Sequence, residues 1–141
     1  MQKNKYKNFW EYYIKNISPK LEQIDILLKA KSYNIPTKTA SLLLNINQKE
    51  IETIMRKQNM SHITSKNFLS IMLNGKSYIC NILKKEYKKN FPQKYSPEDV
   101  SYIYNIDYEK TKQAFEFLNA EKMPSKSLKA IFIQITHINH I

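Results

Sequence analysis

The chain has 141 residues, 42% of them apolar, and a formal net charge of +11 at pH 7. The apolar share is that of a folded protein, so we expect one compact domain or two very small ones and not a disordered chain. A single Gly argues against a glycine-rich phosphate loop, and no apolar run approaches the roughly 20 residues of a membrane span. With one cysteine, Cys80, and no secretory signal at the N-terminus, we expect a cytoplasmic protein.

The positive charge comes almost entirely from lysine, because Arg56 is the only arginine. Lys, Asn, Ile and Tyr are abundant throughout, as in proteins encoded by AT-rich genomes, so part of the excess reflects codon bias. A charge this large on a small protein still attracts nucleic acid. The excess lies in residues 1–95, since residues 96–141 carry five basic and six acidic side chains.

The N-terminal third has the pattern of two helices. An aromatic and apolar stripe predicts the first within residues 7–16, with a core-packing face: Phe9, Trp10, Tyr13 and Ile14. Ser18 and Pro19 are typical of a helix start, as the cap and the first helical residue, and predict a second helix to about Lys31. We expect residues 1–34 to pack on the unit that follows.

Residues 38–57 have the pattern of two short helices joined by a tight turn. Apolar residues recur at helical spacing on both sides, and Asn45 can adopt the left-handed conformation of the turn. Asn47 can cap the second helix with its side-chain oxygen. Opposite its apolar positions, the second helix presents five polar side chains: Gln48, Lys49, Glu52, Thr53 and Arg56.

This stretch resembles the helix-turn-helix superfamily of DNA-binding proteins, including its excisionase-like and MerR-like branches. The resemblance rests on a small residue where the helices touch, a turn residue and three apolar positions: Ser41, Asn45, Ile46, Ile51 and Ile54. The family usually has glycine where this chain has Asn45. The resemblance implies that the helix beginning at Gln48 enters the major groove and that its five polar side chains are candidates for base contacts.

The following segment predicts a short extended return at Met60 and Ile63, a vestige of a β wing. Thr64 or Ser65 can then cap a helix over residues 66–73, which Gly75 would end in the left-handed conformation. Ser77 can cap a long helix to about residue 89. Its basic flank consists of four lysines: Lys84, Lys85, Lys88 and Lys89.

The pattern of residues 35–72 recurs over residues 95–132, an offset of 60 residues. The matches fall at the turn and the caps: Ser41 and Ser101, Asn45 and Asn105, Ile46 and Ile106, Asn59 and Asn119, Ser65 and Ser125. The repeat predicts an all-α fold of tandem helix-turn-helix units with connecting helices and at most a vestigial wing. The expected segments are 1–34, the first unit 35–75, a connecting basic helix and link 76–94, and a second, degenerate unit with a tail, 95–141.

We predict a sequence-specific double-stranded DNA-binding protein, either a small transcriptional regulator or a recombination accessory factor. Phosphate contacts are expected from eight lysines: Lys38, Lys57, Lys66, Lys76, Lys84, Lys85, Lys88 and Lys89. The near-neutral second unit is expected to pack on the first, dimerise or contact another protein. The alternative is a protein-interaction module, an inhibitor or adaptor that keeps the scaffold without binding DNA. RNA binding is a weaker alternative, because most tyrosines occupy apolar helical positions.

Two further expectations concern chemistry. His62, His137 and His140 do not combine with Cys80 at metal-ligand spacing, and no catalytic motif is present. We therefore expect no enzyme activity, metal, cofactor, small-molecule substrate or membrane partner. Arg56 has two interpretations of equal weight, a planar two-pronged contact to guanine or phosphate and an ion pair with Glu52 four residues earlier.

Overall fold

The computed structural model describes residues 6–31 and 34–136, and it is predominantly helical, as predicted. Its helical elements in chain order are α1 (Phe9–Tyr12), the π-helical turn η1 (Tyr13–Ile17), α2 (Ser18–Lys29), α3 (Thr37–Leu44), α4 (Gln48–Lys57), α5 (Ser65–Asn74), α6 (Tyr78–Lys88), α7 (Pro97–Tyr104), α8 (Tyr108–Phe117), the 3₁₀ turn η2 (Ser125–Ser127) and α9 (Leu128–Gln134). The one sheet of the described chain pairs β1 (Lys94–Tyr95) with β2 (Met123–Pro124), antiparallel. The predicted all-α class with vestigial strands is confirmed.

The chain forms two compact units whose boundaries differ from the expected segments. The middle unit is Ile17–Lys84, and the terminal unit combines Met1–Asn16 with Lys85–Ile141. One division falls within η1 and the other within α6. Residues 76–94 are therefore not a separate connecting segment, because most of α6 belongs to the middle unit and its end to the terminal unit.

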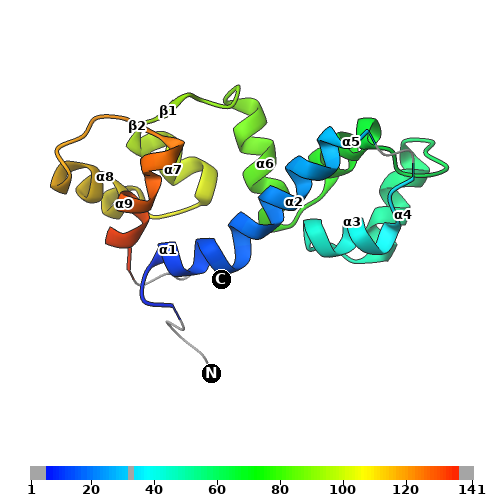
Figure 1. Cartoon of the computed structure of the whole chain (residues 1–141), viewed down its shortest axis with the longest axis horizontal. Helices are drawn as coiled ribbons and strands as arrows, with labels where there is room; N and C mark the ends of the chain where they lie inside the picture. The colour runs from blue at the N-terminus through cyan, green and yellow to red at the C-terminus, as the bar shows by residue number, and fades with distance from the viewer. Residues whose placement is uncertain (1–5, 32–33, 137–141) are drawn as a thin grey trace. The chain divides into compact units, whose positions relative to one another are not determined.

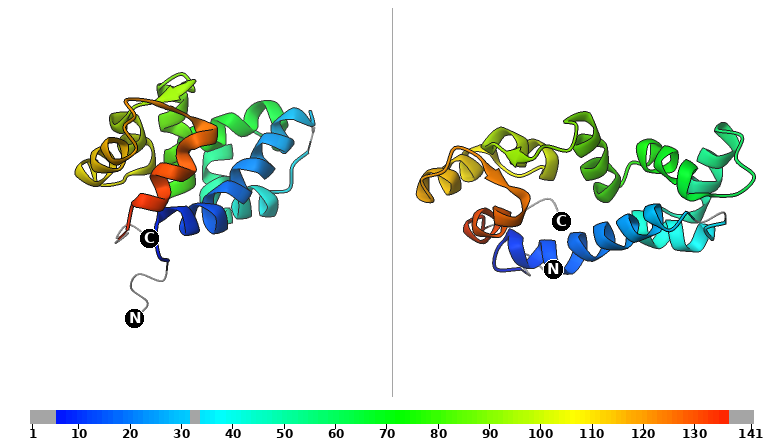
Figure 2. Two further views of the ribbon diagram at one scale, coloured as in Figure 1. Left: turned by 60° about the vertical axis from the view of Figure 1, so that its left-hand side comes forward. Right: turned by 45° about the horizontal axis from the view of Figure 1, so that its top comes forward.

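In the middle unit, α3 and α5 form the centre. α2 and α4 each pack on both of them, and α2 runs beside α5 in Figures 1 and 2. The fully buried side chains are apolar, among them Ala40, Leu44, Ile51, Ile63, Phe68 and Ile71. A capping box begins α5, since Thr64 Oγ1 accepts from Asn67 N at 3.1 Å and Asn67 Oδ1 accepts from Thr64 N at 2.7 Å. Of the two predicted caps Thr64 is the one used, and Ser65 Oγ instead donates to Leu27 O on α2.

The terminal unit is built from both ends of the chain. α7 packs on α8, α8 packs on α9, and α1 packs on α9. The ring of Phe9 meets that of Phe132 edge-on at a centroid distance of 4.8 Å, and Tyr104 meets Phe132 at 5.2 Å. Phe9 N also donates to Ile135 O at 2.8 Å. Residues 1–34 are thus divided between the two units: α2 packs in the middle unit as expected, whereas α1 belongs to the terminal unit.

An α-helix begins at Ser18, as predicted, but Ser18 is not its cap. The backbone is helical without a break from Phe9 to Lys29, and the residue before α2 makes no side-chain cap. Pro19 has no N–H and would clash with the carbonyl four residues earlier in a regular α-helix. Here η1 directly precedes it, and the longer bonding span of a π-helical turn lets the helix continue through the proline.

The 60-residue repeat is present in the backbone and in its hydrogen bonds. Asn45 and Asn105 both adopt the left-handed conformation, with φ of 56° and 55°, and so do Asn59 and Asn119, with φ of 55° and 57°. Ser41 Oγ donates to Ile46 O at 2.6 Å, and Ser101 Oγ donates to Ile106 O at 2.6 Å. The bridge of Ile35 with Ile63 recurs as the pairing of Tyr95 with Met123. The predicted extended return at Ile63 is therefore confirmed.

The role predicted for Gly75 is wrong. Its φ of −78° and ψ of 161° are extended, so no left-handed stop ends α5. The glycine is needed for a different reason, since a Cβ built on it would lie 2.5 Å from Cys80 Sγ and 3.3 Å from Cys80 Cβ. Cys80 is fully buried, and the chain passes so close to it that only a residue without a side chain fits.

Candidate nucleic-acid interface

The turn between α3 and α4 is held by three side chains. Beyond the Ser41 bond, Ile46 N donates to Ser41 O at 3.3 Å, which closes the turn around left-handed Asn45. Lys20 on α2 donates from Nζ to Asn45 Oδ1 at 2.7 Å and also to Leu42 O. Burial lowers the pKa of Lys20. The angle between α3 and α4 is therefore fixed both within the turn and from α2.

α4 presents the predicted polar face to solvent. Asn47 Oδ1 accepts from Glu50 N at 2.8 Å and caps the helix as predicted. Ile51 and Ile54 are buried and hold α4 on the unit. Of the five base-contact candidates, Thr53 is half-buried and the others are exposed: Gln48, Lys49, Glu52 and Arg56. The face that the sequence predicted is thus available to a ligand.

The polar contacts on this face are local. Thr37 Oγ1 donates to Gln48 Oε1 at 3.4 Å, which links the starts of α3 and α4. Arg56 donates from Nη2 to Thr53 Oγ1 at 3.4 Å. Within residues 6–31 and 34–136, Arg56 forms no ion pair with Glu52, so the ion-pair interpretation of Arg56 is wrong. This single long bond leaves the other N–H groups of the guanidinium fork available for a planar contact.

The phosphate-contact candidates divide into two groups. Lys38, Lys57, Lys66 and Lys76 are exposed in the middle unit, and Lys88 is exposed at the end of α6. The other group, Lys84, Lys85 and Lys89, is less available. Lys84 and Lys85 are half-buried, and Lys85 and Lys89 lie over the Tyr102 ring at 5.0 and 5.6 Å from its centroid. Lys89 also pairs with Asp99 at 3.1 Å, so the basic flank predicted on α6 is partly occupied within the protein.

A groove runs along one side of α4. It has a volume of about 290 Å³ and lies between α4 and the segment that follows α5. Its lining residues are Glu50, Thr53, Ile54, Lys57, Gln58, Asn74 and Lys76. Thr53 belongs both to this groove and to the exposed face. Only Thr53, Lys57 and Lys76 of this lining were among the predicted site residues. The other four were missed because no periodic pattern in the sequence marks the residues that line a groove.

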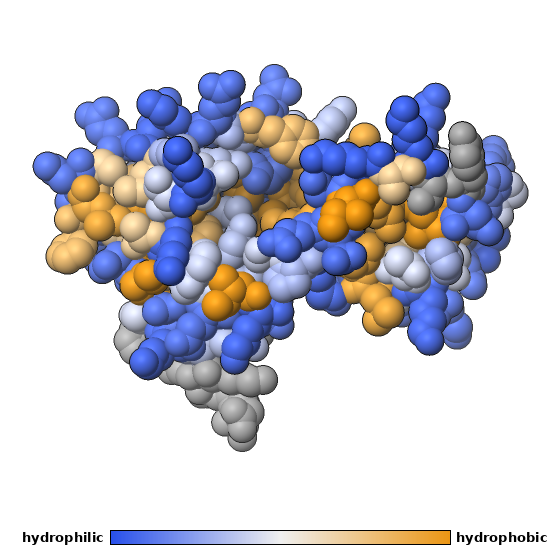
Figure 3. Space-filling model, viewed as in Figure 1, coloured by the Kyte–Doolittle hydropathy of each residue, from blue (hydrophilic) through white to orange (hydrophobic). Residues whose placement is uncertain are grey.

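The middle unit is strongly basic. Residues 17–84 carry ten basic and four acidic side chains, a net charge of +6. In Figure 3, hydrophilic side chains crowd the edge of the middle unit where α4 lies. A face of this charge attracts a polyanion before any specific contact forms.

The equivalent helix of the second copy, α8, presents a different face. Its exposed positions are mixed in charge: Tyr108, Glu109, Lys112, Gln113 and Glu116. Tyr108 donates from its hydroxyl to Glu98 Oε2 at 3.2 Å. A second groove of about 370 Å³ lies beside α8 and is lined by Lys110, Gln113, Ala114, Phe117, Gln134 and Thr136. Phe117 is 73% exposed, an unusual position for an aromatic side chain.

The described residues hold no group of three or more His, Cys, Asp or Glu side chains that could bind a metal ion. His137 and His140 lie outside the described residues. No helix among those described has the length and apolar character needed to cross a membrane. Comparisons with protein-family models, with curated proteins and with solved structures found no match to this chain.

Proposed function

We propose that the middle unit binds double-stranded DNA in a sequence-specific manner, with α4 in the major groove. The observation that supports this most is the combination of a rigidly held turn with an exposed polar face on the helix that follows it. A helix must keep a fixed angle to its scaffold if side chains on it are to meet base edges in register. The bonds from Ser41 and Lys20 to the turn supply that rigidity, and Asn47 fixes the start of α4.

The helix-turn-helix resemblance of residues 38–57 supports the same proposal, as does the net charge of +6 on residues 17–84. Phosphate contacts give affinity and orientation, whereas base contacts give specificity. In this proposal the lysines of the middle unit make the phosphate contacts, and the exposed face of α4 makes the base contacts. A small regulator of transcription or an accessory factor of recombination, acting in the cytoplasm, is the role that we propose for this protein.

The test is selection of bound duplexes from a random pool at physiological salt. We expect an enriched motif, and we expect variants of the α4 face to change it. If the protein binds all duplexes alike and no sequence is enriched, its DNA binding is only non-specific attraction. A protein that binds no duplex would refute the proposal.

Arg56 allows a sharper test of the same face. Arg56→Lys keeps the charge but removes the planar fork, and no ion pair with Glu52 exists to be lost. We expect a loss of about 1–3 kcal/mol of discrimination at one base pair, with the free energy of unfolding unchanged. Measured preferences at every position of the selected site give the readout. An unaltered preference would remove Arg56 from the base-contacting residues.

A second candidate function is protein binding by the terminal unit, and Phe117 favours it. This ring is 73% exposed beside a groove, and the part of the chain around it, residues 96–141, is close to neutral. Exposed aromatic side chains are enriched at protein interfaces. Under this alternative the chain is an adaptor or inhibitor, and the duplex selection yields no motif.

A further inference from the structure

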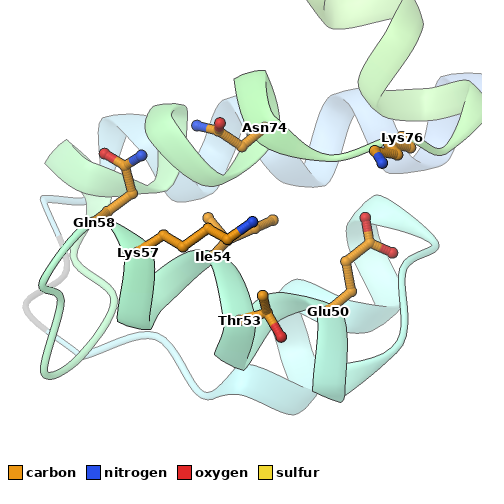
Figure 4. Close-up of a pocket in the computed structure, with 7 residues that line it drawn as sticks. All are labelled: Glu50, Thr53, Ile54, Lys57, Gln58, Asn74 and Lys76. Carbon is orange, nitrogen blue, oxygen red and sulfur yellow. The ribbon is translucent and has the colours of Figure 1, made fainter.

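The groove beside α4 is lined by one lysine from α4 and one from the link that follows α5. In Figure 4 the Lys57 side chain, near the end of α4, extends into the hollow, and Lys76, after α5, borders the same hollow. The Glu50 carboxylate stands at one end of it. In the part of the chain that the structure describes, none of these three groups forms an ion pair. The lining of the groove thus has a net charge of +1.

The hollow itself belongs to the repeated fold. Shifting six of its seven lining residues by 60 gives the lining of the groove beside α8: Lys110 for Glu50, Gln113 for Thr53, Ala114 for Ile54, Phe117 for Lys57, Gln134 for Asn74 and Thr136 for Lys76. The second copy therefore has the same hollow without either lysine, and there Lys110 Nζ donates to Thr136 O at 3.1 Å. The hollow therefore results from the packing that both copies of the repeat share. The pair Lys57 and Lys76, in contrast, occurs only in the groove of the middle unit.

The position of this groove connects it to the proposed base-reading face. Thr53 borders both, and Thr53 Oγ1 accepts from Arg56 on the exposed face. A helix that lies in the major groove has a DNA strand along each of its sides, so the flank of such a helix is where phosphates come close. Two unpaired ammonium groups on that flank match two negative charges of one strand.

We propose that the groove between α4 and the α5–α6 link is the seat of one DNA strand, with Lys57 and Lys76 each neutralising a phosphate. This inference rests on the proposed function and adds to it the side of α4 on which the backbone lies. It also gives Glu50 a role, because a carboxylate at the end of this groove repels the strand and weakens binding to all sequences alike.

The test compares Lys57→Gln/Lys76→Gln with Lys29→Gln/Lys31→Gln. Both variants remove two charges from the middle unit, but Lys29, which ends α2 and pairs with Asp25 at 2.9 Å, and Lys31, just after α2, are exposed outside the candidate interface. Affinity for the selected duplex is measured between 50 and 200 mM salt. We expect the slope of log affinity against log salt to fall by about 1.8 for the groove variant, since each phosphate contributes about 0.9. The advantage of the wild-type protein over this variant then shrinks about 12-fold across that range.

A third variant, Glu50→Gln, has the opposite expected sign. Removing the carboxylate should raise affinity for selected and unrelated duplexes by the same factor, whereas a carboxylate remote from DNA leaves both unchanged. If the groove variant and its control have equal slopes, or if Glu50→Gln has no effect while the wild-type protein binds its site, the strand does not lie in this groove. Failure of the wild-type protein to bind any duplex refutes the proposed function itself and is seen before any variant is made.

Discussion

Gly75→Ala sets two effects of opposite sign against each other in the middle unit. Alanine adopts a φ of −78° without strain, so its smaller unfolded-state entropy would stabilise the protein by about 0.4–1 kcal/mol. Against this, its methyl group would lie 2.5 Å from Cys80 Sγ and 3.5 Å from Ile46 Cδ1. Overpacking of this kind costs about 1–3 kcal/mol, because Cys80 is fully buried and its thiol has no open space to enter. We expect a net loss of about 1–2 kcal/mol in the free energy of unfolding.

A double-mutant cycle with Cys80→Ala isolates the clash. The cysteine variant alone should lose about 1 kcal/mol through the deleted sulfur. Gly75→Ala/Cys80→Ala should be no less stable than Cys80→Ala alone, because the new methyl group then occupies the vacated space. Urea unfolding under reducing conditions gives these values from far-UV circular dichroism. Trp10 fluorescence follows the terminal unit separately. A Gly75→Ala variant as stable as the wild-type protein would refute the steric argument.

Two further predictions concern the turns and one half-buried carboxyl group. Asn45→Ala and Asn105→Ala should each lower the free energy of unfolding in urea by about 1 kcal/mol, because alanine tolerates the left-handed conformation less well than asparagine. Asn45→Ala should lose about 0.5 kcal/mol more, because it also removes the hydrogen bond from Lys20. Equal losses in the two variants would show that this bond contributes nothing to stability. Burial raises the pKa of Glu86, whose carboxylate accepts from the Tyr95 hydroxyl at 2.9 and 3.0 Å. A raised pKa means that the folded unit holds this proton more tightly than the unfolded chain, so stability from this group is present below the usual glutamate pKa and is lost as the pH rises through the raised value. Glu86→Gln should therefore match the wild-type protein in acid and exceed it in stability at pH 7; a variant less stable than wild type at pH 7 would contradict this.

The local features of the fold could be predicted from the sequence because each depends on neighbouring residues. Asn45 and Asn105 indicate left-handed turns, Asn47 and Thr64 indicate caps, and the helical spacing of apolar residues indicates the buried faces. The repeat reinforced these predictions, since the same geometry is required twice.

The features that the sequence could not give are contacts between distant residues. The stripe at Phe9 predicts burial, but nothing in it indicates that Phe132 is the partner. The sequence around Gly75 predicts a helix stop, because nothing local indicates that Cys80 lies against this glycine. In the same way, a basic flank at Lys85 and Lys89 looks available for phosphate until Tyr102 and Asp99 are found beside it. The Lys20 bond to Asn45 spans 25 residues and has no local signal.

The terminal unit draws on both ends of the chain, and this imposes an order of events during synthesis. The middle unit, Ile17–Lys84, is contiguous and can fold as soon as it leaves the ribosome. Phe9 emerges early but finds Phe132 only when almost the whole chain has been made, roughly 6–25 s later at about 5–20 residues per second. During that interval the ring lacks its contact with Phe132, although the middle unit can already be complete. Nascent chains stalled after α8 should therefore contain a folded middle unit and an N-terminal aromatic segment that chaperones can bind.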